Sequence, residues 1–239
     1  MNISFRKILV CLVTVFALGA VAASAASADV GQTFAGFAST TGDPFTSKDT
    51  SASVLEGGGN KITCKEEKSS AGEVTGPSGT STVGKVVVKF IKCEGESTKG
   101  KCTVKSSKEP AGSENVTTEA LKGELGETTQ SKEKEVGLLL EPEVKSTGFV
   151  TLEGSCLTVS PTKVEGSIAG EVKPVGPPKA KAGELVFTVS AGKQAITEFE
   201  TSKDVKVKPS LKAFGAITVT ENTKDAVEYT EALEVTAGE

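Results

Sequence analysis

Histidine and tryptophan are absent from this 239-residue chain, and tyrosine and methionine each occur once. Without histidine, the Ser-His-Asp and Cys-His catalytic arrangements are excluded, and so is every imidazole base or metal ligand. With Tyr229 as the single tyrosine and no tryptophan, the stacking aromatic side chains that sugar sites use are scarce. These absences disfavour, without excluding, a glycosidase or a lectin.

Motifs of the common catalytic classes are also missing. The chain contains no G-x-S-x-G, Walker loop, dinucleotide fingerprint or EF-hand. Ser190-Ala-Gly-Lys193 matches S-x-x-K, but it follows a predicted strand, contains glycine and lacks the companion S-D-N and K-T-G elements. We interpret it as a plain turn. The sequence therefore predicts that the protein is not an enzyme, with no catalytic or cofactor-binding residue, no metal ligand and no cofactor.

Acidic residues are abundant, with 31 Asp and Glu in the chain. The alternative function is an extracellular hydrolase that uses a pair of carboxylates, which needs two inward acids about 5 to 9.5 Å apart in a cleft. At least one of them should have a raised pKa. Spacing along the sequence cannot select such a pair. We interpret Glu66-Glu67 and Glu141-x-Glu143 as solvated faces or strand ends rather than cation sites.

Residues 1–28 have the pattern of a secretory signal peptide. Arg6 and Lys7 give a basic start, an apolar run follows, and Ala26-Ser27-Ala28 fits a cleavage site. We expect a secreted protein that is extracellular or associated with the cell envelope. No later apolar run approaches the ~20 residues that span a bilayer, so we expect no membrane segment after cleavage.

The charge distribution narrows the choice of partner. Removal of residues 1–28 takes away Arg6 and Lys7 and changes the formal net charge from −4 to −6, with both signs interspersed. This disfavours nucleic acid or an anionic membrane as the partner. The partner is otherwise unknown, and an apolar small ligand or a component of the cell envelope both fit.

Four cysteines remain after cleavage, namely Cys64, Cys93, Cys102 and Cys156. An even number in an exported chain predicts two disulfides, and the absence of histidine disfavours a metal site. Three pairings are open. We favour Cys93–Cys102 and Cys64–Cys156, because the polar loop 94–101 follows a strand-prone run and suggests a hairpin with Cys93 opposite Cys102.

Short strand-like runs with turn residues between them fill the rest of the chain. Val86, Val88 and Phe90 alternate with residues of a second face that includes Cys93. Further hairpins are predicted within 52–66 and 121–142. Helical periodicity is absent. We predict an all-β fold, an antiparallel β-barrel or β-sandwich of many short strands with two disulfides.

The predicted domain organisation is simple. Residues 29–50 are weakly patterned and form an N-terminal arm or an edge strand. Residues 51–239 form a single β-rich domain. The proline-rich loop 175–183 is an alternative boundary, beyond which the remaining residues would form a subdomain.

Five ordered motifs resemble those of a known protein group. They are ITC at 62–64, V-x-F-x-x-C at 88–93, LKGELG at 121–126, VGLLLEP at 136–142 and GSIAGEVKPV at 166–175. The chain is similar, over roughly 55–175, to exported, uncharacterised β-rich proteins found in multiple copies in some soil actinobacteria. The resemblance implies an exported β-rich domain with paired cysteines, and it implies no activity.

Export, crosslinking and the missing catalytic groups together favour one function. We expect a secreted non-enzymatic β-rich module with a structural or binding role outside the cell or in its envelope. A closed or partly closed β framework can hold an apolar small ligand in its interior. A solidly packed interior would leave only a structural or protein-binding role.

Overall fold

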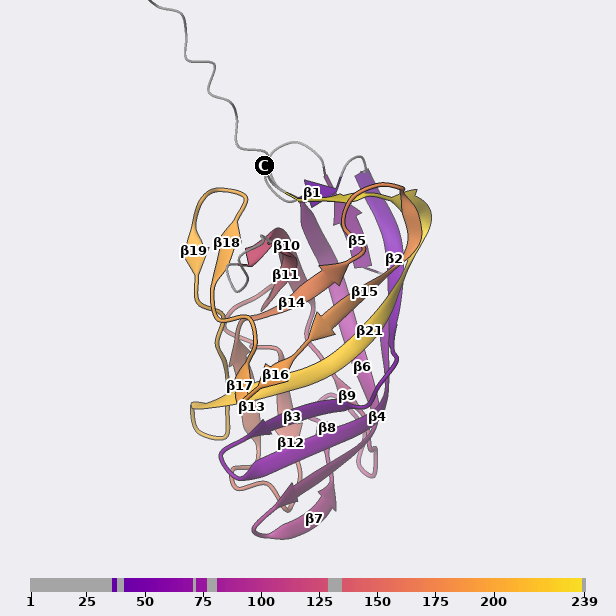
Figure 1. The fold of residues 1–239 in the computed structure, drawn as a ribbon. Coiled ribbons are helices and arrows are strands. Elements are labelled where there is room, and N and C mark those ends of the chain that lie inside the picture. Colours follow the sequence, from indigo (N-terminus) through magenta and orange to yellow (C-terminus); the bar gives the residue numbers. More distant parts are fainter. Residues whose placement is uncertain (1–35, 38–40, 71, 77–80, 129–134, 238–239) are drawn as a thin grey trace, which may run out of the picture. The chain divides into compact units, whose positions relative to one another are not determined.

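The computed structural model describes residues 36–37, 41–70, 72–76, 81–128 and 135–237 (Figure 1). The predicted signal peptide lies outside the described residues. Within the described part of the chain there is no helix, and strands predominate. Consequently no described helix is long and apolar enough to cross a membrane. The predicted all-β fold is confirmed.

The strands run in the following order along the chain: β1 (Gly36–Phe37), β2 (Thr41–Asp49), β3 (Ser53–Gly57), β4 (Asn60–Ser70), β5 (Gly72–Thr75), β6 (Thr82–Ser97), β7 (Gly100–Thr103), β8 (Lys105–Ser106), β9 (Val116–Thr117), β10 (Leu121–Thr128), β11 (Glu135–Pro142), β12 (Val150–Glu153), β13 (Thr162–Gly166), β14 (Ile168–Lys173), β15 (Ala180–Phe187), β16 (Val189–Ser190), β17 (Lys193–Gln194), β18 (Phe199–Thr201), β19 (Lys206–Val207), β20 (Leu211–Ala213), β21 (Ile217–Leu233) and β22 (Val235–Thr236).

Ten of these strands close into an antiparallel barrel, which is one of the two predicted architectures. Neighbouring strands β6, β10, β11, β14, β15 and β21 form most of the wall. Two pairs of strands connect β21 to β6 and close the ring. One pair is β3 with β4, and the other is β2 with β5. The closed ring has an interior into which alternate side chains of every wall strand point.

Strand β21, drawn in yellow in Figure 1, is the longest element, with 17 residues. It pairs in turn with β20, β3, β2 and β15. Four of its side chains that lie two or four positions apart are buried, as expected for a strand with one face toward the interior. They are Val219, Thr223, Asp225 and Val227. Two of these four inward side chains are polar, which is unusual for a barrel interior.

Aliphatic and phenylalanine side chains fill most of the interior. Val74, Val104, Leu125 and Leu152 are each at most 2% exposed. Burial of one such side chain stabilises a fold by roughly 1.5–3 kcal/mol relative to leaving it in water. The apolar interior is therefore the main source of stability, and the disulfides add to it.

Two predicted hairpins are confirmed. The β3–β4 hairpin turns through Gly58 and Gly59, whose φ angles of 59° and 72° are ones that glycine adopts without strain. The β10–β11 hairpin pairs Leu121 with Pro142 and continues in register to its outer end. Both hairpins supply strands of the barrel wall.

The predicted N-terminal arm and the predicted boundary loop both contribute residues to strands of the sheet. Strand β2, in the segment expected to be an arm or an edge strand, pairs with β21 on one side and with β5 on the other. Strand β15 begins within the loop 175–183 and pairs with β14 and β21. The described residues all belong to one compact unit.

The two predicted disulfides are present, but the favoured pairing is wrong. The bonds are Cys64–Cys93 and Cys102–Cys156. Strand β6 continues beyond Cys93 and turns through only two residues into β7, so that Gly95, and not Cys93, lies opposite Cys102. Cys93 lies directly opposite Cys64 on β4. Two such bonds are consistent with maturation in an oxidising compartment.

A local change of backbone direction explains why alternation misplaced Cys93. Lys92 has a φ angle of 56°, which interrupts the regular pleat of β6. Cys93 therefore turns to the same inner side as Val86 and Val88 instead of the opposite side, and it is fully buried. There its sulfur meets that of Cys64.

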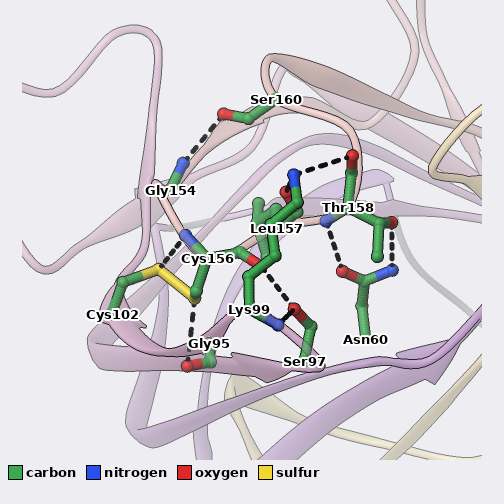
Figure 2. Close-up of a disulfide and its surroundings, with 10 residues drawn as sticks. All are labelled: Asn60, Gly95, Ser97, Lys99, Cys102, Gly154, Cys156, Leu157, Thr158 and Ser160. Carbon is green, nitrogen blue, oxygen red and sulfur yellow. Dashed lines mark hydrogen bonds between the residues drawn. A yellow bond between two sulfur atoms is a disulfide. The ribbon is translucent and has the colours of Figure 1, made fainter.

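The surroundings of the second disulfide are densely hydrogen-bonded (Figure 2). The backbone N–H of Cys156 donates to Cys102 Sγ at 3.0 Å. Lys99 Nζ donates to the carbonyl oxygen of Thr158 at 3.2 Å. The Asn60 side chain donates to Thr158 Oγ1 at 2.7 Å and accepts from the Thr158 N–H at 2.8 Å. These bonds fix the loop that carries Cys156 against the β3–β4 and β6–β7 hairpins.

Candidate functional site

Acids from three strands meet on the inner face of the barrel. Asp49 ends β2 and lies directly opposite Asp225 of β21. Lys48 pairs with Lys68, which places Glu67 of β4 beside Asp49 on its other side. Glu67 and Asp225 are each only 4% exposed, while the lysines point outward. Glu67, Asp49 and Asp225 therefore form a row across three neighbouring strands.

Glu221 extends this row along β21. It lies on the same inward-facing side as Asp225, and its carboxyl group is close enough to Asp225 to be repelled by it. We name Asp49, Glu67, Glu221 and Asp225 the acidic cluster. Like charges directly across a sheet destabilise it, so these side chains need protons or a counter-charge.

The acidic cluster lies where the barrel wall is interrupted. Strand β2 ends at Asp49 and β3 begins at Ser53, so residues 50–52 belong to no strand. Strand β21 pairs with β3 up to Asn222 and with β2 from Asp225 onward. Between these points, Thr50 N donates to the Lys224 carbonyl oxygen at 2.7 Å and holds the chain against β21.

Two hydroxyl groups donate hydrogen bonds to the cluster. Ser53 Oγ donates to Glu67 Oε2 at 3.2 Å, and Thr223 Oγ1 donates to Asp225 Oδ1 at 3.2 Å. The Ser53 and Thr223 hydroxyls lie 3.0 Å from each other. Each hydroxyl has a single proton, so both protons cannot serve the carboxyl groups and also bond to the neighbouring hydroxyl. The cluster is therefore poor in donors.

Two carboxyl oxygens of the cluster have no hydrogen-bond partner at all. Asp49 Oδ2 and Glu221 Oε1 are both enclosed by protein and unpaired. Glu221 as a whole residue is only partly buried, but this oxygen is not accessible to solvent. A buried acceptor without a donor typically costs about 1–3 kcal/mol of stability. The protein tolerates this cost at the interruption of the wall.

Burial and mutual repulsion raise three carboxyl pKa values. Burial, followed by the charges of Asp225 and Glu221, raises the pKa of Glu67 to about 9. Burial and the charge of Asp225 raise the pKa of Glu221 to about 8. Burial raises the pKa of Asp225 to about 7, although its hydrogen bond from Thr223 opposes the shift. At neutral pH the cluster therefore retains protons that ordinary carboxyl groups would have lost.

The larger of the two interior cavities that border the cluster is lined by residues of several wall strands. It has a volume of about 110 Å³, and its walls include Phe149, Ile168 and Phe187. Glu67 and Glu221 belong to the lining, as do Ser53 and Thr223, whose hydroxyls are described above. Apart from Thr118, the polar residues of this otherwise apolar chamber are those at the acidic cluster.

The smaller cavity shares part of this lining. It has a volume of about 60 Å³ and is bordered by Glu67, Asp225 and Tyr229. Val88 and Leu140 line both cavities, as Glu67 does. Glu67 therefore borders the two chambers at once.

Basic side chains are missing from both linings, as far as the described residues go. Glu184 borders the smaller cavity but has its own partner, since Lys224 Nζ lies 2.8 Å from its carboxylate. Burial raises the pKa of Tyr229 to about 12, so this side chain stays neutral. The described protein groups thus supply no positive charge to the acidic cluster.

The S-x-x-K segment forms a surface hairpin. Ser190 pairs with Lys193 across the short β16–β17 ladder, and Ala191 and Gly192 form the turn with φ angles of 50° and 73°. The side chains of Ser190 and Lys193 are exposed. The segment lies apart from the acidic cluster and contributes nothing to either cavity lining.

The Glu66-Glu67 pair shows what sequence reasoning missed. Glu66 is on the outer face, where Lys92 Nζ lies 3.0 Å from its carboxylate and lowers its pKa. Our interpretation of a solvated face is right for Glu66 and wrong for Glu67, which is buried opposite Phe90. Adjacent residues of a strand point to opposite faces, so one of the two had to face inward.

No group of three or more Cys, Asp or Glu side chains in the described ranges has the geometry to hold a metal ion. Comparisons with known proteins reveal no relationship. No protein-family model matches the chain, and no curated protein or solved structure matches it. The function must therefore be argued from the acidic cluster and its cavities.

Proposed function

We propose that the protein is an exported, non-enzymatic β-barrel module that binds a small, largely apolar ligand inside the barrel. The observation that carries this proposal is the 110 Å³ cavity, whose lining is apolar apart from three hydroxyl residues and the acids Glu67 and Glu221. Binding sites for small molecules combine apolar walls with a few convergent polar groups. The cavity has this composition.

The cavity volume limits the size of the ligand. Sites for drug-sized ligands occupy roughly 300–1,000 Å³, whereas an apolar protein cavity of about 150 Å³ holds benzene. A cavity of about 110 Å³ suits a molecule of a few carbon atoms.

Export supports a role outside the cell. The expected signal peptide and the two disulfides both fit a protein that works in the extracellular space or in the cell envelope. The absence of histidine and of catalytic motifs supports a binding role over catalysis. We therefore propose capture or carriage of the ligand rather than its conversion.

Binding of small probes tests this function. Benzene and n-butanol should bind the protein saturably and shift amide resonances of residues that line the cavity. Val88→Met should weaken binding by at least about tenfold, since methionine fills irregular gaps and Val88 lines both cavities. Val144→Met is the matched control, because Val144 is exposed and belongs to neither lining. Absence of saturable binding by either probe would refute the proposal.

A carboxylate hydrolase is the second candidate, and one observation favours it. Glu67 and Asp225 are inward acids with raised pKa values, as this class requires. However, the two groups interact strongly, because a hydrogen bond from the Glu67 carboxyl group lowers the pKa of Asp225. Glycosidases need a separation of about 5 Å or more. Turnover of an oligosaccharide that is lost in Glu67→Gln would establish the hydrolase instead.

A further inference from the structure

We infer that the ligand of the barrel interior carries a primary amine, which binds as an ammonium group against the acidic cluster while its apolar body fills the larger cavity. This inference rests on the proposed binding function and specifies the chemistry of the ligand. It follows from three features of the site, which are its donor deficit, its uncompensated acids and the position of its polar groups.

The donor deficit is the first feature. Hydroxyl groups donate to only two of the four carboxyl groups, Glu67 and Asp225, and the Asp49 and Glu221 oxygens described above are unpaired. An ammonium group has three N–H donors and no acceptor, which complements an acceptor-rich site. An alcohol has one donor and brings a further acceptor. The site therefore matches an amine better than a hydroxyl compound of the same size.

The charge balance is the second feature. Glu67 faces Asp49 of β2 and both Glu221 and Asp225 of β21, while its cross-strand neighbour on β6 is the uncharged Phe90. The remaining titratable groups that border the cavities are Glu184 and Tyr229 of the smaller cavity, as described above. No described group that faces the cluster is cationic. A bound cation would supply the missing charge.

The position of the polar groups is the third feature. Glu67 and Glu221 border the larger cavity, whose other walls are mainly aliphatic and phenylalanine side chains. A short alkyl chain in this chamber places a terminal ammonium group at the carboxyl groups. Hydrogen bonds between charged groups are roughly twice as strong as those between neutral groups, which gives the amine its preference.

The pair n-butylamine and n-butanol tests the inference, because the two probes differ only in the head group. We expect the wild-type protein to bind the amine at least about tenfold more tightly at pH 8. The preference should increase between pH 6 and pH 9, since the acids lose protons in this range while an alkylamine stays protonated to about pH 10. Titration calorimetry in two buffers should detect proton release on binding of the amine.

Neighbouring glutamates provide a matched pair of variants. Glu67→Gln should reduce the preference for the amine to within about twofold and leave butanol binding intact, because the chamber keeps its shape. Glu66→Gln removes an identical charge from the outer face and should leave the preference unchanged. Butanol binding equal to or tighter than amine binding would overturn the inference but leave the proposed function standing. If neither compound binds, both fail.

Discussion

The two disulfide bonds and the acidic cluster share strand β4, which carries both Cys64 and Glu67, yet their surroundings differ in hydrogen bonding and charge. Around Cys102–Cys156, Lys99 donates to the backbone carbonyl oxygen of Thr158, and the Asn60 side chain donates to the Thr158 hydroxyl and accepts from the Thr158 N–H (Figure 2). Around Glu67, acids face acids, and buried oxygens remain unpaired. A covalent bond secures the first region, whereas the acids of the second region have no counter-charge and too few hydrogen-bond donors.

This difference favours the acidic cluster, and not the disulfide region, as the functional part of the barrel. Unsatisfied buried groups and strongly shifted pKa values reduce stability, and they persist in proteins mainly at sites with a task. The following experiments change one region at a time and compare the consequences.

The largest effect should follow from removing the Cys102–Cys156 bond in the double variant Cys102→Ala, Cys156→Ala. The bond closes a loop with a sequence separation of 54 residues. On the chain-entropy model, its loss lowers the free energy of unfolding by about 4 kcal/mol. Urea denaturation of the wild type and the variant measures the difference. A loss below about 1 kcal/mol would mean that the hydrogen bonds around the loop, and not the crosslink, secure this region.

The pH dependence of stability should reveal the acidic cluster. Glu67, Glu221 and Asp225 have raised pKa values in the folded state, so the folded protein holds protons that the unfolded chain releases. Stability from these groups is therefore fully present below about pH 4.5 and is lost as pH rises through 7 to 9. We expect the free energy of unfolding to fall by about 3 kcal/mol between pH 5 and pH 9.

Two variants assign this pH dependence to the interior. Glu67→Gln should flatten the profile and make the protein more stable than the wild type at pH 9, since an uncharged side chain replaces a buried charge. Glu66→Gln should leave the slope unchanged, because that carboxyl group already has an ordinary outer-face partner in Lys92. A profile that is flat in the wild type would contradict the shifted pKa values.

Much of the fold could be predicted from sequence, because it depends on local signals. Alternating apolar residues, the Gly58-Gly59 turn and the absence of helical periodicity were sufficient for an all-β fold with hairpins. The cysteine pairing could not be predicted, because it depends on the register of β4 against β6 and on a single irregular residue, Lys92. Backbone irregularities of this kind leave no compositional signature.

The acidic cluster was hidden for a related reason. Glu67 and Asp225 are separated by 158 positions in the sequence and meet only because β2 lies between β4 and β21. Among 31 acidic residues, nothing local distinguishes these. The alternation rule could have shown that one of Glu66 and Glu67 faces inward, but it could not have identified the partners across the barrel.

A smaller effect is expected from Gly95→Ala, which tests packing in the disulfide region. A methyl group at Gly95 would lie 2.7 Å from Val104 Cγ2 and 3.1 Å from Cys156 Sγ. We expect a loss of about 2 kcal/mol, typical of overpacking in a dense core. Gly84→Ala, in the same strand, has open space at the equivalent position and is the control. Equal stability of both variants in thermal denaturation would show that the disulfide region is loosely packed.

The smallest effect should come from an exposed ion pair near the disulfide region, which separates the role of charge from that of burial. Lys101 Nζ lies 3.6 Å from Glu96 on the facing strand, and the two side chains are 71% and 58% exposed. Water screens such a pair, so Lys101→Ala should change the free energy of unfolding by less than about 0.5 kcal/mol. Denaturation in 0.05 and 0.5 M NaCl should shift the variant and the wild type alike. A loss above about 1 kcal/mol, abolished by salt, would show that surface charge also stabilises the barrel. Charge would then affect stability in both regions. The unpaired oxygens of Asp49 and Glu221 would be the one remaining difference between the acidic cluster and the disulfide region.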